Sequence, residues 1–395
     1  MKRFFSYTIL SFFLLLLPTG QASANNNDSI RLSLLTCAPG EEIYSLFGHT
    51  AIRYENSSQG IDVVFNYGLF SFNTPNFIFR FSLGETDYQL GATDYERFAA
   101  EYAFFGRSVW QQTLNLTDEE KTELIRLLQE NYRPENRVYR YNFFYDNCAT
   151  RPRDKIEESI AGKVIYPAEP QDGSLTFRDI VHQYCKGHPW ARFGIDLCIG
   201  SEADQPITQR QMMFAPFYLM DAFDGAQIKG DSIQRPLITA NELVVDATPE
   251  PDESDWMPTP LQCSLLLFIL TAAATIYGIR RRTGLWGIDL FLFGIAGIVG
   301  CVLAFLALFS QHPAVSSNFL LLVFHPGQLL FLPYIIYCVR KGKKCWYLTL
   351  NLAVLTLFIV LFPVIPQRFD FAVVPLALVL LIRSVSNLIV TSKKK

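Results

Sequence analysis

The last third of the chain is dominated by long apolar stretches that are separated by short polar connectors. There are five of them, at 261–279, 286–309, 319–339, 346–365 and 371–389. Each has about 19–24 residues, enough for a helix to cross roughly 30 Å of hydrocarbon at a rise of about 1.5 Å per residue. The pattern predicts an all-α membrane domain of five transmembrane helices at 261–395.

The connectors between these stretches indicate how the domain is oriented. Arginines at 280–282 follow the first stretch, lysines at 341, 343 and 344 follow the third, and lysines at 393–395 follow the fifth. Positively charged connectors stay on the cytoplasmic side of a membrane. We therefore expect a multi-pass protein of the bacterial cytoplasmic (inner) membrane, with its C-terminus in the cytoplasm and the residues before the first span in the periplasm.

The N-terminus has the three-part pattern of a secretory signal. Lys2 and Arg3 precede an apolar core at 9–17, and Ala22-Ser23-Ala24 offers small residues for cleavage. The apolar core is short for a membrane span, so residues 1–24 are predicted to be a signal peptide rather than an uncleaved anchor. The signal and the connector charges therefore agree that the domain at 25–245 is periplasmic.

A polar segment joins this domain to the first span. Residues 246–260 contain four prolines and five acidic side chains, a composition typical of an extended tether. We expect this linker to hold the soluble domain close to the membrane surface.

Within the soluble domain, the alternation of side chains predicts a strand at 30–37 and a β-hairpin formed by 47–54 and 61–67. The hairpin loop centres near Ser57 and Ser58, so His49 lies opposite Asn66, within a residue or so of register. Paired residues of a hairpin project to the same face of the sheet. His49 and Asn66 are therefore expected to be neighbours.

Two helices are indicated downstream of the hairpin. Thr117 and Glu120 form a capping box for a helix that extends to about Tyr132, with leucines at 124, 127 and 128 on one face. An aromatic run at 139–145 then leads into a second helix that starts at or just before Cys148. Pro152 is compatible with that helix because it falls in the first turn.

Composition and charge restrict the function classes. Half of the residues are hydrophobic, 18% are charged and the formal net charge is −3. These values exclude a disordered chain and a nucleic-acid binder that works through bulk positive charge. The sequence has no HExxH, CxxC, GxGxxG or P-loop pattern, so we expect neither a metal nor a nucleotide cofactor.

Three residues form a candidate catalytic set. Cys148 at a helix N-terminus is a candidate nucleophile, because amide donors and the helix dipole favour thiolate there, and Arg151 and Arg153 would act the same way. His49 is the candidate base and Asn66 the group that orients it. The amide of Cys148 is a candidate oxyanion donor.

Each of these residues also has a structural interpretation. Cys37 could form a disulfide with Cys148, which would remove the nucleophile, or it could simply lie in the core at the end of its strand. Cys185 and Cys198 flank a short loop and are predicted to form a local disulfide. His182 and His188 are expected to be structural, whereas His325, inside an apolar stretch, is a functional candidate.

Several motifs resemble a known family. They are LTCAPG at 35–40, YSLFGHTAIR at 44–53, FNYG at 65–68 and YNFFYDNCATR at 141–151. These segments resemble the N-terminal periplasmic domain of Lnb-type lipoprotein N-acyltransferases, over most of 30–240. The order of His, polar residue and Asn-Cys also resembles permuted papain-like proteins, namely NlpC-type peptidases and lecithin–retinol acyltransferase. The implied architecture is an α+β, permuted papain-like periplasmic catalytic domain followed by the membrane domain.

The resemblance implies a thioester mechanism. Cys148, deprotonated by His49, would take an acyl chain from a membrane phospholipid and pass it to the α-amino group of a diacylglyceryl-cysteine lipoprotein. The candidate substrate-binding residues are Arg53, Tyr67 and Arg151, which lie in the matching motifs, and Arg153, two residues beyond the last of them. The expected partners are the phospholipid donor, the lipoprotein acceptor and the bilayer, with no nucleic acid.

Two other classes remain open at this point. The same residues could hydrolyse a lipid or a peptidoglycan crosslink, with water in place of the amine. The chain could also be a non-catalytic envelope assembly protein in which Cys148 is structural.

Overall fold

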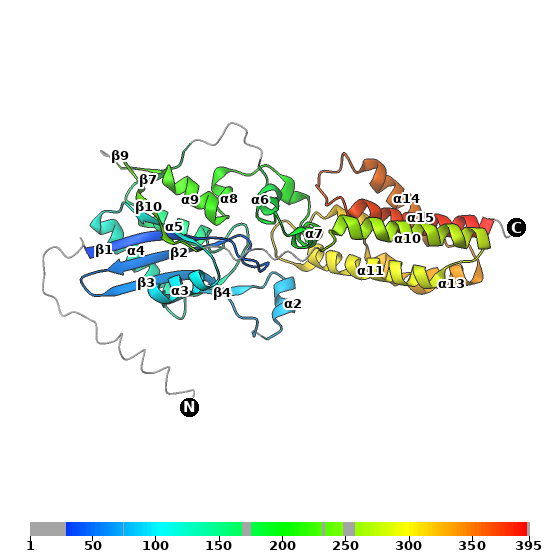
Figure 1. The fold of residues 1–395 in the computed structure, drawn as a ribbon, viewed down its shortest axis with the longest axis horizontal. Coiled ribbons are helices and arrows are strands. Elements are labelled where there is room, and N and C mark those ends of the chain that lie inside the picture. The colour runs from blue at the N-terminus through cyan, green and yellow to red at the C-terminus, as the bar shows by residue number, and fades with distance from the viewer. Residues whose placement is uncertain (1–28, 74, 168–174, 231–233, 248–256, 393–395) are drawn as a thin grey trace, which may run out of the picture.

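In the computed structural model, an α+β domain lies at one end and a helical bundle at the other (Figure 1). The described residues are 29–73, 75–167, 175–230, 234–247 and 257–392. The predicted signal peptide at 1–24 and the middle of the predicted linker lie outside these ranges. Below, the two parts are called the sheet domain and the bundle.

A seven-stranded antiparallel sheet, in the order β10-β5-β1-β2-β3-β4-β6, organises the sheet domain. Its strands are β1 (Ile30–Cys37), β2 (His49–Asn56), β3 (Ile61–Leu69), β4 (Asp87–Asp94), β5 (Val109–Leu114), β6 (Val138–Arg140) and β10 (Ile238–Val245). A small second sheet contains β7 (Lys163–Ile165), β8 (Gln227–Lys229) and β9 (Gln234–Pro236). The predicted strand at 30–37 and the predicted hairpin are confirmed.

Helices cover both faces of the large sheet. The sheet domain contains the helices α2 (Phe77–Ser82), α3 (Tyr95–Phe104), α4 (Asp118–Tyr132), α5 (Thr150–Ser159), α6 (Phe177–Tyr184), α7 (Pro189–Cys198), α8 (Gln209–Met212) and α9 (Pro216–Asp224). Phe98 of α3 packs against Leu35 and Ala51, and Leu124 of α4 belongs to the core that contains Leu34. Adjacent strand residues thus serve opposite faces, as the period-two alternation of a strand requires.

The capping box at the start of α4 is confirmed. Thr117 Oγ1 accepts from the Glu120 amide at 3.3 Å, and the Glu120 carboxylate accepts from the Thr117 amide at 2.8 Å. Leu124 and Leu128 are buried on the inner face of the helix. The local pattern and the packing therefore give the same helix.

The bundle contains α10 (Pro260–Arg281), α11 (Trp286–Phe309), α12 (Pro326–Leu330), α13 (Leu332–Lys341), α14 (Trp346–Leu361) and α15 (Val373–Ser392). Among the described residues, α10, α11 and α15 are long and apolar enough to cross a membrane, with a fourth span if a bent pair counts as one. All five predicted stretches are thus helical, but the third is bent and the fourth forms a helix shorter than expected.

Prolines explain this difference. The third stretch bends by 73° between its halves, Phe319–Leu330 and Leu332–Lys341, and both α12 and α13 have a proline within their first two positions. The fourth stretch ends as a helix at Leu361, before Pro363 and Pro366. The sixteen residues of α14 extend for only about 24 Å, less than the hydrocarbon thickness.

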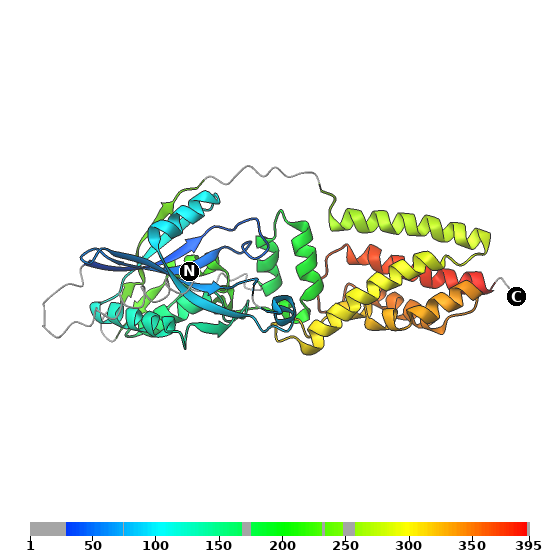
Figure 2. The ribbon, with the colours of Figure 1, turned by 90° about the horizontal axis from the view of Figure 1, so that it is seen from below.

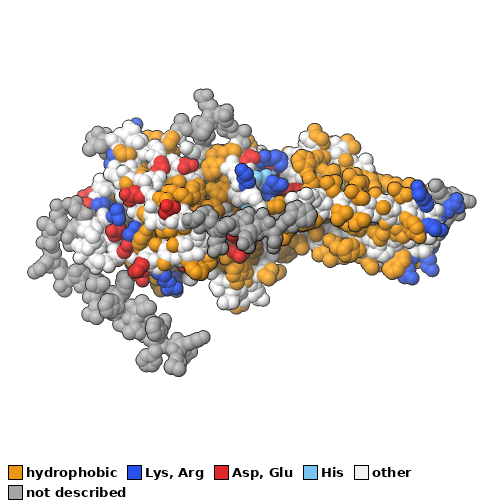
Figure 3. Space-filling view, in the orientation of Figure 1, with side chains coloured by type: hydrophobic (Ala, Val, Ile, Leu, Met, Phe, Trp, Pro, Cys, Tyr) orange, Lys and Arg blue, Asp and Glu red, His pale blue; other side chains and the backbone are white. Residues whose placement is uncertain are grey.

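Lys and Arg side chains gather at the end of the bundle that points away from the sheet domain (Figure 3). At the opposite end, α6 and α7 lie between the sheet and the bundle in both ribbon views (Figures 1 and 2). This arrangement matches the charge asymmetry of the connectors, with the sheet domain on the side that has few basic residues.

Hydrogen bonds fix the junction between the two parts. Arg368, in the connector before α15, donates to Asp179 at 2.5 Å and to Asp204 at 3.0 Å. Asn318, in the connector after α11, donates to the Leu197 carbonyl at 2.7 Å. The sheet domain is therefore held directly against the membrane-spanning part.

Candidate active site

The chain reaches the site through a tight turn before β2. Gly48 has a φ of +76°, and a Cβ at this position would lie 2.6 Å from the carbonyl oxygen of Cys37. A residue with a side chain would therefore be strained and would clash with the backbone of β1. This close approach allows β2 to begin at His49, opposite Cys37 of β1.

His49 and Asn66 are brought into contact across the hairpin. The register pairs Ile52 with Phe65, so its continuation places His49 opposite Gly68 and makes Asn66 the diagonal neighbour. His49 Nε2 forms a short hydrogen bond with Asn66 Oδ1. Since an amide oxygen only accepts, Nε2 carries the proton and Nδ1 keeps a free lone pair.

The residue before Cys148 organises the start of α5. Asn147 Oδ1 accepts from the amides of Ala149 and Thr150, both at 2.9 Å, while its Nδ2 donates to the carbonyls of Phe143 at 2.9 Å and Phe214 at 2.8 Å. All four hydrogen bonds are within the usual range. Cys148 is thus held rigidly just ahead of a helix that starts at Thr150.

Cys148 lies against the start of β2 and the end of β3. Its sulfur accepts hydrogen bonds from the amide of Thr50, the hydroxyl of Tyr141 and its own amide. A Cβ added to Gly68, which has a φ of +89°, would lie 3.4 Å from the Cys148 Cβ. Because Thr50 follows His49 directly, the Cys148 sulfur lies at the start of β2, the strand that His49 begins.

Burial controls the charge of both groups. Although Cys148 keeps some surface exposure, burial raises the pKa of its thiol to about 11, against the lowering effect of hydrogen bonds from Thr50 and Tyr141. Burial also lowers the pKa of His49 to about 4, although its hydrogen bond to Asn66 opposes this change. At neutral pH both the Cys148 thiol and the His49 imidazole are therefore neutral.

The expected effect of two arginines on the thiol is not found. Arg151 forms a bidentate ion pair with Asp146, at 2.6 and 2.7 Å, and stacks 3.6 Å over the ring of Tyr139. Arg153 donates to Asp154, and neither arginine contributes to the pKa of Cys148. The prediction of a thiolate stabilised by these arginines is therefore wrong for the resting protein.

The other proposed substrate-binding residues also have partners within the fold. Arg53 donates to both carboxylate oxygens of Asp62, at 2.8 and 2.6 Å, and lies 3.3 Å over the ring of Tyr95. Tyr67 is fully buried, and its hydroxyl donates to Asn131 at 2.9 Å. These contacts hold both side chains within the fold, and their role in substrate binding stays a prediction.

All described cysteines are free thiols. The predicted disulfide between Cys185 and Cys198 is absent, and Cys37 is not linked to Cys148. Cys37 is fully buried opposite His49, and this burial raises the pKa of its thiol to about 12. His182 contacts the buried Asp196, which is a structural role.

Tyr141 and Thr50 belong to the site but were not identified from the sequence. Tyr141 lies in the aromatic run before Cys148, and the sequence does not show which tyrosine of that run contacts the sulfur. The Thr50 contact uses a backbone amide, which carries no residue-specific signal. In the part of the chain that the structure describes, no group of three or more His, Cys, Asp and Glu side chains could hold a metal ion.

The raised pKa of Cys148 makes a testable prediction. Only the thiolate reacts with iodoacetamide, so alkylation should be slow at pH 7 and should quicken about tenfold per pH unit up to roughly pH 10. Peptide mapping of the solubilised full chain measures the rate at Cys148, with circular dichroism to verify the fold at each pH. A constant, fast rate between about pH 5 and 7 would instead indicate a thiolate–imidazolium pair.

Comparison with protein families covers most of the chain. The model of the Lnb N-terminal periplasmic domain matches residues 20–182, which include His49, Asn66 and Cys148, and the model of the Lnb transmembrane domain matches residues 252–395. No curated protein and no solved structure matches. With both domains present in this order, the chain belongs to the Lnb family of membrane proteins.

Proposed function

We propose that this protein is a thiol-dependent acyltransferase that moves an acyl chain from a phospholipid to the α-amino group of a lipidated N-terminal cysteine of a lipoprotein. The observation that carries the proposal is the site at the start of β2. The Cys148 thiol there accepts hydrogen bonds from Thr50 and Tyr141, and the imidazole of His49, the residue before Thr50, is oriented by Asn66. The family name supports a lipoprotein substrate.

The first half-reaction acylates Cys148. His49 Nδ1 takes the thiol proton as the sulfur attacks the carbonyl carbon of a phospholipid ester. The tetrahedral intermediate collapses by breaking the bond between that carbon and the glycerol oxygen, and the imidazolium returns the proton to the departing alkoxide. The products are an acyl thioester on Cys148 and a lysophospholipid.

The second half-reaction transfers the chain to an amine. The neutral α-amino group of the lipoprotein attacks the thioester carbonyl, and His49 takes the proton that the nitrogen loses. The carbon–sulfur bond then breaks, and Cys148 regains its proton from the imidazolium. The overall reaction exchanges an ester for an amide and needs no co-reactant. A thioester intermediate also lets the two lipids visit one site in succession.

Neutral resting groups suit this chemistry. A base with a pKa of about 4 is unprotonated over the whole physiological range, so His49 is always ready to accept the thiol proton. The donors that point at the sulfur, namely Tyr141 and the amides of Thr50 and Cys148, are placed to shift to the oxyanion as it forms. Removing one such donor from an oxyanion hole typically lowers the catalytic rate by about 10²–10³-fold.

The position of the site next to the membrane supports lipid substrates. Contacts such as Arg368–Asp204 and Asn318–Leu197 hold the sheet domain on the bundle. Both substrates lie in the bilayer, so confinement to its surface raises their effective concentration. We further propose that the membrane is the bacterial cytoplasmic membrane and that the C-terminus is cytoplasmic, because the basic residues gather at the far end of the bundle (Figure 3).

The test is the intact mass of the purified full chain after incubation with phosphatidylethanolamine vesicles. We expect a hydroxylamine-labile acyl adduct that maps to Cys148, together with stoichiometric lysophospholipid and no free fatty acid. Adding a diacylglyceryl-cysteine peptide should discharge the adduct and yield an N-acylated peptide. Equal amounts of free fatty acid and lysophospholipid would indicate a hydrolase, and a protein that stays unmodified and releases no lipid product would favour a non-catalytic role.

A further inference from the structure

Helix α2 exposes an unusual apolar surface. Ile78 and Phe79 are 80% and 59% exposed, Phe72 just before the helix is 65% exposed, and none of the six helix residues is buried. A soluble domain rarely exposes large apolar side chains in one cluster without a binding partner. This surface is therefore adapted to an apolar environment.

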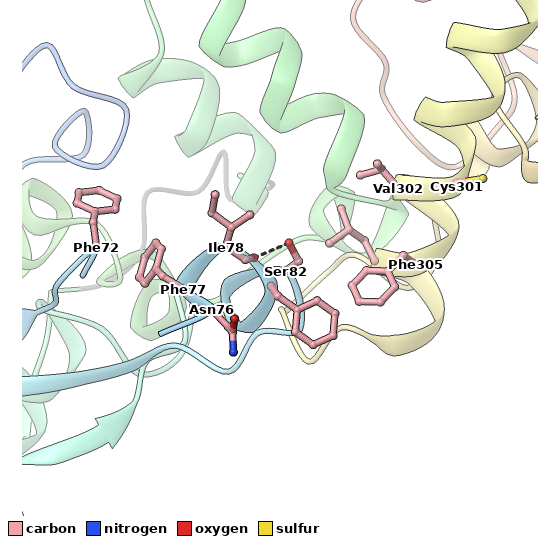
Figure 4. A pocket seen from close by; sticks show the side chains of 10 residues that line it. Phe72, Asn76, Phe77, Ile78, Ser82, Cys301, Val302 and Phe305 are labelled. Carbon is pink, nitrogen blue, oxygen red and sulfur yellow. Dashed lines mark hydrogen bonds between the residues drawn. The ribbon is translucent and has the colours of Figure 1, made fainter. Parts of the chain in front are cut away.

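The surface faces the bundle across a cavity of about 940 Å³. Phe72, Phe77 and Ile78 line it from the sheet domain, and Cys301, Val302 and Phe305 line it from the end of α11 that lies next to the sheet domain. Figure 4 shows Phe305 on the side of α11 that faces α2, with Ile78 projecting from α2. Phe79 is also in ring contact with Phe305, with centroids 6.1 Å apart.

Contacts at the end of α2 hold this arrangement in place. His312 Nε2 donates to the carbonyl of Phe81 at 2.6 Å, and the amide of Gln311 donates to the carbonyl of Leu83 at 2.8 Å. Both partners lie in the connector that follows α11. The cavity is therefore formed jointly by the sheet domain and a membrane-spanning helix.

A continuous series of aromatic rings leads from this cavity to the nucleophile. Phe77 stacks on Phe70 with centroids 6.0 Å apart, Phe70 stacks on Tyr88 at 4.9 Å, and Tyr88 contacts Tyr141 at 4.4 Å. Tyr141 donates to the sulfur of Cys148. Phe70, Phe77, Tyr88 and Tyr141 are only half-buried, so their surfaces remain available to a ligand.

We propose that this cavity and aromatic series bind one fatty acyl chain of the donor glycerophospholipid. The carbonyl lies at Cys148, the first part of the chain runs along Tyr141, Tyr88 and Phe70, and the methyl end lies between α2 and α11. The inference rests on the proposed acyl transfer and adds the path of the chain to it. The occupant is a lipid because one wall belongs to a membrane span, whose surrounding solvent is acyl chains.

Photo-crosslinking can follow the direction of the chain. The probes are phosphatidylethanolamines with a diazirine either at the methyl end or beside the carbonyl of one chain, in vesicles with the full-length Cys148→Ala protein. We expect the methyl-end probe to label Phe77–Phe79 or Phe305, and the carbonyl-end probe to label Phe70, Tyr88 or Tyr141. Peptide mapping by mass spectrometry locates the labels.

A pair of matched variants tests the cavity itself. Val302→Trp fills it from α11, whereas Ile295→Trp adds the same bulk to an exposed position seven residues away on the same helix face. Displacing about two methylene groups from an apolar site lowers affinity by about tenfold. We therefore expect methyl-end labelling of α2 to fall about tenfold in the first variant and to stay unchanged in the second.

Two results would overturn the proposal. In the first, the methyl-end probe labels only residues within the spans, while the carbonyl-end probe labels α2. Labelling of this kind is expected if α2 merely rests on the surface of the bilayer. The other is equal labelling of α2 in the two tryptophan variants. If labelling follows the proposed path while wild-type protein forms no thioester, the cavity binds lipid but the proposed transfer fails. A thioester without this labelling contradicts only the cavity.

Discussion

Replacing Cys148 with alanine should abolish acyl transfer while leaving the protein folded. The sulfur is the only atom in the site that can form the thioester, and loss of a catalytic nucleophile typically costs more than about 10⁴-fold in rate. Folding should persist because the capping hydrogen bonds of Asn147 to Ala149 and Thr150 do not involve the Cys148 side chain. The measurements are N-acylation of a diacylglyceryl-cysteine peptide and the thermal unfolding midpoint.

Cys37→Ala is the matched control. Like Cys148, Cys37 is a thiol near the start of β2. It lies at the end of β1, opposite His49, and its hydrogen-bond partner is Tyr102 in the core. This variant should keep most of the activity and lose only stability. If Cys148→Ala retains full activity and Cys37→Ala loses it, Cys37 is the nucleophile and the site described above is wrongly assigned.

Elements with a local signal could be predicted from the sequence. The strand at 30–37 and the capping box at Thr117 depend on residues close together in the chain, and both are found as expected. The position of Cys148 just ahead of a helix follows from the same kind of signal, because Pro152 is tolerated only in a first turn. The predicted contact between His49 and Asn66 is found, but the strand register differs by two residues, so they meet as diagonal neighbours and not as an opposite pair.

Long-range contacts could not be predicted in this way. The carboxylates that bind Arg53 and Arg151 and the amide that binds Tyr67 compete with any substrate, and which partner a side chain takes depends on the packed structure. The charge state of the Cys148 thiol also depends on the packed structure. Helix position and nearby arginines favour thiolate, but desolvation, which the sequence does not reveal, has the larger effect.

The membrane spans show a different limit. Mean hydropathy measures how apolar a stretch is but not whether its backbone can stay helical. Proline at 326 and 333 interrupts the third stretch, and proline at 363 and 366 ends the fourth. Breaks of this kind are tolerated where neighbouring helices or polar groups satisfy the freed backbone. Here the Gln328 side chain donates to the Val323 carbonyl at 2.8 Å, next to the break.

Replacing His49 with alanine should lower the rate of thioester formation by about 10²–10⁴-fold. Without the imidazole, the thiol must lose its proton to water, and a pKa of about 11 leaves very little thiolate at neutral pH. The difference in rate between the wild-type protein and the variant should therefore shrink as pH rises, because hydroxide replaces the missing base. The measurement is the single-turnover rate of Cys148 acylation between about pH 6 and 10. A loss that stays constant across this range would exclude a base role for His49.

Replacing Asn66 with alanine should cost less, about tenfold to a hundredfold, because the residue positions the base without touching substrate. Asn66→Asp separates positioning from mere packing. A carboxylate at this place still accepts from His49 Nε2 but stabilises the imidazolium, so it raises the pKa of His49 from about 4. His49 is then protonated, and unable to act as a base, already at a higher pH. The acidic limb of the pH–rate profile should therefore move to higher pH in this variant alone. If Asn66→Asp and Asn66→Ala give the same profile, the contact between Asn66 and His49 does not set the state of the base.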